Sequence, residues 1–108
     1  MAQPEIPVER VFHAMGDPTR RAIVELLAQG PLSVSALAAP LGVTLTAISQ
    51  HLQILEEAGL AATQKIGRVR TCRLETRGLD VLQSWIAERR PLWDKRLDAL
   101  GSVLGESG

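Results

Sequence analysis

The residues best suited to bind a partner gather in one stretch of the chain. If the segment from about residue 45 to 58 is a helix that buries Ile48, Leu52 and Leu55, its opposite face is small, polar and uncharged. A Gln amide can make a bidentate contact with adenine, Ser and Thr hydroxyls can bond bases or phosphates, and a small Ala can meet a thymine methyl group. The residues at the outward, flanking and N-terminal positions of this helix are Thr44, Thr46, Ala47, Ser49, Gln50, His51 and Gln53.

The composition of this face distinguishes between two explanations of its Ser and Thr residues: capping of the helix start, or contact with a partner. A Ser/Thr-rich helix start is common wherever a helix needs capping. Capping alone does not explain why no Lys or Glu occurs from Thr44 to Leu55, since exposed helices usually carry charges. We therefore favour a face that contacts DNA, with Thr46, Ser49 and Gln50 at the bases and His51 near a phosphate.

Positive charge is concentrated immediately after this segment. The chain has 12 Lys and Arg against 12 Asp and Glu, and the zero sum argues against a strongly electrostatic nucleic-acid binder. No Lys or Arg lies between Arg21 and Lys65, however, and only Glu75 opposes the cations that follow. These cations are Lys65, Arg68, Arg70, Arg73 and Arg77. An anionic partner would bind at these cations, but the cluster taken alone favours the simpler interpretation of a solvated surface.

The elements around these residues follow from periodicity and turn chemistry. A helix is expected at about residues 7–15, and Asp17-Pro18 should cap and open a second one. Ser33 should cap a short third helix, in which Pro40 falls late. Gly42 forms the turn before the fourth helix, which Thr44 or Leu45 opens.

The second half of the chain changes period. Residues 60–66 and 69–75 alternate as two strands around Gly67-Arg68, so that Cys72 and Leu74 share a face. The segment from about residue 79 to 104 is helical, and Pro91 should kink or split it. Two helices joined at a glycine turn and followed by a basic hairpin predict one mainly α domain over residues 1–108. We expect a winged helix-turn-helix with five or six helices and a two-stranded wing.

Composition excludes several other classes. With 108 residues and 45% hydrophobic content the chain can bury one core. It has no apolar run long enough to span a membrane, and its first residues lack the apolar stretch of a signal peptide. A single Cys rules out an intramolecular disulfide, so we expect a cytoplasmic protein without a membrane partner.

Catalysis has no basis in the sequence. No Ser/His/Asp arrangement, phosphate-cradling glycine loop or paired-carboxylate motif is recognisable. His13 and His51 are the only histidines, and neither has partners for a metal site. We expect no enzyme activity, no catalytic residues and no cofactor.

Three motifs together resemble the ArsR-type bacterial transcriptional repressors. The family's typical "ALADPTRLRILELL", "SVSHHLKVLREAGLV" and "REGRWVYYRL" stretches are similar to residues 14–27, 47–60 and 64–74, in that order. The resemblance covers roughly residues 8–78 and implies a homodimer that binds operator DNA and releases it when an inducer binds. It also implies DNA contacts at Thr46, Ser49, Gln50 and His51, and wing contacts at Arg68 and Arg70.

The resemblance further implies pairing through the first and last helices. Those segments hold more apolar surface than one small domain is expected to bury, and we expect Trp93 and Leu97, beyond Pro91, to lie in the interface. The full set of expected interface residues is Val8, Val11, Phe12, Trp85, Ile86, Trp93, Leu97 and Leu100.

The metal sites common in the family lack their ligands here. Ser35 stands where a third-helix thiolate would be, and a neutral hydroxyl is a poor ligand for soft metals. The last helix has no histidine, and its carboxylates are scattered among cations as in ordinary surface pairs. Those carboxylates are Asp80, Glu88, Asp94 and Asp98. We expect no high-affinity transition-metal site.

Several alternatives stay open on the sequence alone. Cys72 has two readings: a buried small apolar residue, which we favour, or a thiol switch activated by Arg70 and Arg73. Two interpretations of the regulatory signal are equally open: a hydrophobic small molecule that binds near Trp85 or Trp93, or regulation by abundance without a ligand. The rival function is a winged-helix module that binds proteins and has lost DNA binding, against which the clustered arginines argue.

Overall fold

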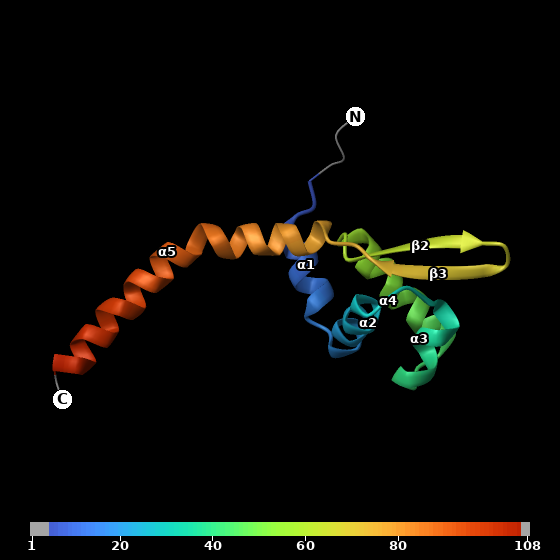
Figure 1. Ribbon diagram of the computed structural model, residues 1–108, viewed down its shortest axis with the longest axis horizontal. Helices are drawn as coiled ribbons and strands as arrows, with labels where there is room; N and C mark the ends of the chain where they lie inside the picture. Colours follow the sequence, from blue (N-terminus) through green and yellow to red (C-terminus); the bar gives the residue numbers. More distant parts are fainter. Residues whose placement is uncertain (1–4, 107–108) are drawn as a thin grey trace.

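Five helices and three short strands make up the part of the chain that the computed structural model describes, residues 5–106. In chain order the elements are α1 (Val8–Met15), α2 (Pro18–Ala28), β1 (Leu32–Ser33), α3 (Val34–Leu41), α4 (Leu45–Glu57), β2 (Ala61–Ile66), β3 (Val69–Leu74) and α5 (Arg77–Glu106). Helices α1 to α4 and the sheet form a body, from which the β2–β3 hairpin extends at one end and α5 at the other (Figure 1). The described part is elongated, with extents of 65 × 39 × 20 Å.

Side-chain caps begin three of the helices. Asp17 caps α2, Ser33 caps α3 and Thr44 caps α4. Each side-chain oxygen accepts a hydrogen bond from the amide three residues later, at 3.0 Å for Asp17 and 3.1 Å for Ser33 and Thr44. Each cap thereby satisfies one of the amide groups that a helix start leaves unpaired. The predicted caps at Asp17 and Ser33 are confirmed, and the fourth helix begins at Leu45 behind its Thr44 cap.

The buried core fixes the orientation of α4. Ile48, Leu52 and Leu55 are each at most 2% exposed, as predicted from their spacing. They pack in one cluster with buried residues of α1, α2, α3 and β3. The largest fully buried side chains are Val11, Ile23, Leu37, Ile48, Leu52, Leu55, Leu60 and Cys72.

A close glycine contact joins the end of α4 to the start of α5. Gly59 follows the last turn of α4 with a φ of +68°, and its carbonyl accepts a hydrogen bond from the Gly78 amide at 2.8 Å. A Cβ on Gly78 would come within 2.2 Å of the Ala58 carbonyl oxygen. Only glycine fits this position without moving the backbone, so the contact sets where the hairpin leaves the body.

The sheet has three strands, not the predicted two. β3 is central and antiparallel to both neighbours, in the order β1-β3-β2. Leu32 and Ser33 of β1 pair with Cys72 and Thr71 of β3. Two residues are too few to show strand alternation in a sequence, so this pairing, which anchors the start of α3 to the hairpin, had no detectable signal. The predicted hairpin turn is confirmed, with Gly67 at a φ of +62°.

The last helix runs through its proline. Of the two outcomes predicted at Pro91, a kink or a split, the split does not occur, since α5 is continuous from Arg77 to Glu106 with Pro91 inside it. The ribbon does change direction about halfway along (Figure 1), as expected where one backbone hydrogen bond is removed. Pro91 leaves the carbonyl group of Ala87 without its helical donor, and Ala87 is exposed, so water can hydrogen-bond that carbonyl.

Cys72 provides a test of the core. The side chain is 0% exposed, which confirms the structural reading of this residue. Burial raises the pKa of the Cys72 thiol because the thiolate would be poorly solvated, and the nearby Arg70 charge acts in the opposite direction. Since the thiolate is the reactive form, the folded protein should react slowly with iodoacetamide at pH 8.

We expect labelling of the folded protein to be at least about a hundredfold slower than labelling of the urea-unfolded chain at the same pH, equivalent to an opening free energy of about 3 kcal/mol. The rate is measured by mass spectrometry of the alkylated chain. Equal rates in both states would show that the thiol is accessible and would revive the thiol-switch reading.

Candidate nucleic-acid interface

The outward face of α4 is exposed and uncharged, as its wheel position predicts. Thr46, Ser49, Gln50 and Gln53 are exposed, and Ala47 is half-buried beside them. Thr44 is exposed at the N-cap, where its hydroxyl is already occupied by the helix amide. A helix packed on one side and polar on the other can enter the major groove without burying unpaired charge.

A tight turn positions α4 relative to α3. Gly42 adopts a left-handed conformation with φ +66°, and its amide donates to the Ala38 carbonyl at 3.0 Å. This left-handed end of α3 lets the chain reverse within two residues before Thr44 caps α4. The two helices and their glycine turn form the predicted helix-turn-helix.

The hairpin carries exposed cations near its tip. Lys65 and Arg70 lie directly opposite each other in the β2–β3 register, and Arg68 lies in the turn. All three are exposed, and no carboxylate of residues 5–106 lies within 4.0 Å of them. Facing like charges repel each other, so an anion placed between them would be stabilising. Of the other predicted cations, Arg77 forms an ion pair with Glu75.

A groove brings the hairpin and α4 together. It has a volume of about 340 Å³ and lies between the start of α3, the start of α4 and the wing. Its lining residues are Ser33, Val34, Ser35, Leu45, Ser49, Arg68, Val69 and Arg70. The sequence predicted Ser49, Arg68 and Arg70 as binding residues, and the structure places all three on this groove. It did not predict the residues from β1 and the start of α3, because the β1–β3 pairing that brings them here gives no sequence signal.

Polar side chains tie the base of the wing to α4. Thr63 on β2 donates a hydrogen bond to the Glu56 carboxylate near the end of α4. Arg70 Nη2 lies 3.4 Å from the Thr63 hydroxyl oxygen. The wing and α4 are therefore held together as one unit rather than joined only through the backbone.

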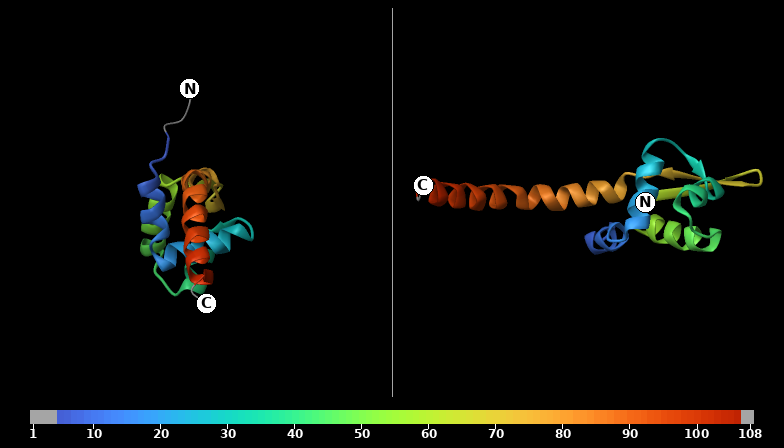
Figure 2. Two further views of the ribbon diagram at one scale, coloured as in Figure 1. Left: turned by 90° about the vertical axis from the view of Figure 1, so that its left-hand side faces the viewer. Right: turned by 90° about the horizontal axis from the view of Figure 1, so that it is seen from below.

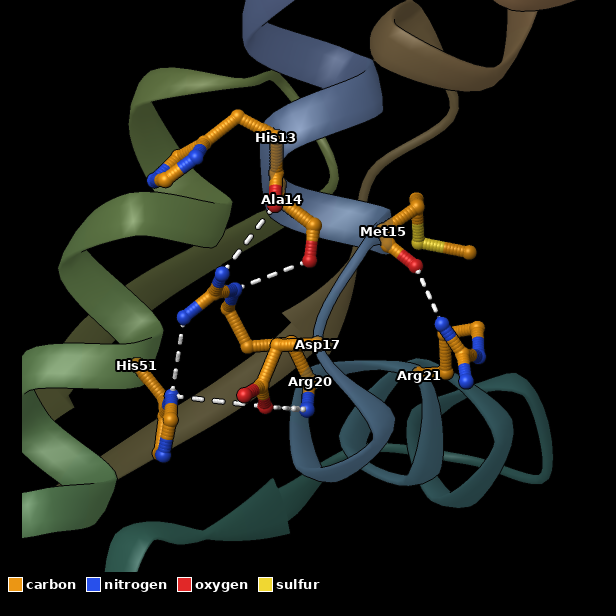
Figure 3. A network of polar contacts seen from close by, with 7 residues as sticks. All are labelled: His13, Ala14, Met15, Asp17, Arg20, Arg21 and His51. Atoms are coloured by element: carbon orange, nitrogen blue, oxygen red, sulfur yellow. Dashed lines mark hydrogen bonds and ion pairs between the residues drawn. The ribbon is translucent and has the colours of Figure 1, made fainter.

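His51 lies at the edge of the polar face and is already engaged within the protein. Its side chain is 22% exposed, and its Nδ1 lies 3.2 Å from Arg20 Nη1 and 4.0 Å from Asp17 Oδ2 (Figure 3). The hydrogen bond from the Arg20 amide is the main reason that the pKa of Asp17 is lowered, and the nearby positive charge adds to the effect. The predicted phosphate contact of His51 thus comes with an inner partner, Arg20, that the sequence did not single out.

The residues expected at a dimer interface divide by exposure into three groups: buried, half-buried and exposed. Val11 is 0% exposed inside the protomer, so it is a core residue and its prediction as an interface residue is wrong. It points from α1 into the same core cluster as Ala14, which leaves no surface for a partner chain. The half-buried members are Val8 and Trp85, and the exposed ones are Phe12, Ile86, Trp93, Leu97 and Leu100.

Aromatic rings join α1 to α5. Phe12 packs edge-on against Trp85 with ring centroids 5.1 Å apart, and Trp93 lies 5.8 Å from Trp85. The C-terminal half of α5 projects away from the body, as the right-hand view of Figure 2 shows. Leu97, Leu100 and Leu104 on this free half are 55–64% exposed.

Within the described range, 5–106, no three His, Cys, Asp or Glu side chains are grouped so that they could hold a metal ion. In the same range, no helix has the length and apolar character required to cross a bilayer.

The comparisons with known proteins agree with this geometry. The family profile described as "Helix-turn-helix domain" matches residues 15–64. The chain is 37% identical over 100 residues to the HTH-type transcriptional regulator Rv2034 of Mycobacterium tuberculosis, covering 93% of this chain and 91% of that protein. It is 32% identical over 79 residues to the transcriptional repressor SdpR of Bacillus subtilis, covering 73% of this chain and 88% of that protein.

Solved structures share both the fold and part of the sequence. The crystal structure of the ArsR family transcriptional regulator RHA00566 is 40% identical with a TM-score of 0.76, covering 87% of this chain and 97% of that one. The homodimeric winged helix-turn-helix DNA-binding domain Mb0332 from Mycobacterium bovis is 32% identical with a TM-score of 0.63, covering 77% of this chain and 80% of that one. From its helix-turn-helix, its wing and its similarity along nearly the whole chain, we conclude that this protein belongs to the ArsR family of winged helix-turn-helix transcriptional regulators.

Proposed function

We propose that this regulator is a cytoplasmic homodimer that represses transcription by binding an inverted-repeat operator in double-stranded DNA. The observation that carries the proposal is the groove shared by the uncharged start of α4 and the wing arginines. Ser49 of α4 and Arg68 and Arg70 of the wing all line it. This arrangement lets α4 approach base edges while the wing contacts the neighbouring phosphates.

The roles of the residues follow from their chemistry. Thr46, Ser49 and Gln50 read or anchor bases, helped by Ala47 and Gln53 at the edges of the face. The start of α4 at Thr44 and the imidazole of His51 contact phosphate. Lys65, Arg68 and Arg70 supply most of the salt-dependent affinity, since each phosphate they neutralise releases counterions.

A twofold dimer is supported by the exposed apolar half of α5. Trp93, Leu97 and Leu100 lie on one side of the helix, where a second copy would cover them. In a dimer with twofold symmetry, two copies of α4 enter successive major grooves about 34 Å apart, which requires an operator with imperfect inverted symmetry. The homodimeric relative from M. bovis and the repressor from B. subtilis support pairing and repression, respectively.

We propose that the signal that releases DNA is something other than a transition metal. Ser35 lies exposed on α3 where a thiolate would be needed, and the chain's one Cys is buried elsewhere. A hydrophobic small molecule near Trp85 or Trp93, or control by abundance alone, fits the chain equally well. The protein acts by occupying DNA and performs no catalysis.

The test of the proposal is an electrophoretic shift with the promoter region of the protein's own gene, titrated with salt. We expect a specific complex that weakens steeply as salt rises. Absence of any shift, together with capture of a protein partner through α4, would favour the rival interaction module.

Replacing Gln50 tests base reading. Gln50→Ala removes the side chain best able to bind adenine in a bidentate fashion, so operator binding should weaken by about 1–3 kcal/mol while binding to random DNA changes little. Fluorescence anisotropy with operator and scrambled duplexes measures both. Gln83→Ala, an exposed Gln on α5, is the matched control, and an equal loss on both duplexes would contradict the assigned role.

Replacing Arg68 tests the phosphate contact. Arg68→Ala should weaken binding to operator and random DNA alike and reduce the slope of log K against log salt by about 1. The control is Arg96→Ala, which removes an exposed cation from the far half of α5. A loss confined to the operator, with the slope unchanged, would show that Arg68 reads sequence instead.

Replacing Leu97 tests the dimer. Leu97→Asp places a charge on the apolar side of α5 and should convert the dimer to a monomer, measured by sedimentation equilibrium. Ser102→Asp places the same charge on the opposite side of the helix and should leave the dimer intact. A variant Leu97→Asp that remains dimeric would exclude this half of α5 from the interface.

A further inference from the structure

Arg20 is the one charged side chain buried among the described residues, with 8% of its surface exposed. No carboxylate of residues 5–106 forms an ion pair with its guanidinium. Instead, Nε donates to the Ala14 carbonyl at 2.8 Å and Nη2 donates to the His13 carbonyl at 3.0 Å, both at the end of α1 (Figure 3). The third group, Nη1, points to His51 on α4 at 3.2 Å. One side chain of α2 therefore links the end of α1 to the proposed DNA-binding helix.

The chemistry of this link determines the protonation of His51. A guanidinium has only donors and no acceptor, so the Nδ1 atom facing it must be unprotonated and must accept. The neutral ring then carries its proton on Nε2. Figure 3 shows this second ring nitrogen on the side of the imidazole away from Arg20.

The competing arrangement is a charged His51 paired with Asp17, and the distances argue against it. Asp17 Oδ2 lies 4.0 Å from Nδ1, farther than Arg20 Nη1 at 3.2 Å. The same carboxylate oxygen already accepts the Arg20 amide at 3.0 Å as the cap of α2. A proton on Nδ1 would replace the shorter contact with a repulsion between two donors.

We infer that Arg20 is a positioning residue for DNA binding, which fixes His51 as the Nε2–H tautomer and presents that N–H to a phosphate of the bound DNA. This inference rests on the proposed function, since it assigns the inner partner of a proposed phosphate contact. The hydrogen bond to Nδ1 also fixes the ring orientation, as the second partner of a histidine generally does.

The neighbouring Arg21 provides a matched control. Its Nη1 donates to the Met15 carbonyl at 2.7 Å, so it too binds the backbone at the end of α1. It is exposed, and within residues 5–106 no hydrogen bond or ion pair joins its side chain to α4. Arg21→Lys therefore reproduces the chemical change of Arg20→Lys without touching His51.

The first measurement is the tautomer itself, read from the ring ¹⁵N shifts of the free protein by NMR. We expect wild type and Arg21→Lys to show His51 with its proton on Nε2. Arg20→Lys, which cannot reach all three acceptors, should show a mixture of tautomers. An Nδ1–H tautomer or a charged ring in the wild type at neutral pH would overturn the inference whatever the protein binds.

The second measurement is operator affinity. We expect Arg20→Lys to raise the Kd roughly five- to tenfold, the range of one lost hydrogen bond, and Arg21→Lys to raise it less than about twofold. In a His51→Gln background, where the Nδ1 acceptor is gone, Arg20→Lys should cost less than about twofold. An equal cost in both backgrounds would show that Arg20 acts through the α1 carbonyls and would overturn the role assigned through His51.

A pair of His51 variants keeps the test decisive if Arg20→Lys does not fold. Asn places an acceptor near the Nδ1 position but lacks the outward N–H, whereas Gln retains an outward N–H. His51→Asn should therefore lose roughly five- to tenfold in affinity and His51→Gln less than about threefold. The reverse order would overturn the inference.

Failure of the proposed function is distinguishable from failure of this inference. If the wild-type protein shifts no promoter DNA, the proposed function fails, and the tautomer spectrum then reports separately whether the Arg20–His51 contact exists.

Discussion

The structure depends on the burial of one side of α4. Ile48, Leu52 and Leu55 lose nearly all contact with water, and each contributes on the order of 1.5–3 kcal/mol. Because a helix turns about 100° per residue, fixing these three side chains inward fixes Thr46 and Gln50 outward. The proposed recognition face and the buried core therefore share one helix, and a substitution on its buried side would also shift its polar face.

The charged residues of this protein are unevenly distributed over its structure. The total charge is zero, yet the wing holds several cations without carboxylate neighbours, while the carboxylates gather elsewhere, as at Glu75 beside Arg77 or Asp94 beside Arg90. The carboxylate of Glu56, at the end of α4, accepts a hydrogen bond from Thr63 at the base of the wing. The distribution of charge, and not its sum, is what makes one end of the molecule suited to a polyanion.

The sequence predicted the features that arise from local periodicity and capping. The caps at Asp17 and Ser33, the glycine turn at Gly42, the inward residues of α4 and the hairpin around Gly67 all leave short-range patterns. Features made by distant segments were missed. β1 is only two residues long and pairs with a strand some forty positions later. The contact of Arg20 with His51 joins residues 31 apart in sequence, and Val11 was placed at an interface because α1 alone does not show which of its sides the core covers.

The facing cations of the hairpin have a further consequence for how salt acts. Lys65 and Arg70 oppose each other across β2 and β3, so in the DNA-free protein their repulsion works against the pairing of these strands near the tip. Dissolved ions screen that repulsion and tighten the free hairpin, whereas the same ions compete with DNA for the cations. For the proposed function, ionic strength therefore has opposite effects on the two states: it lowers the repulsion within the unbound wing while it weakens the proposed complex of the wing with DNA.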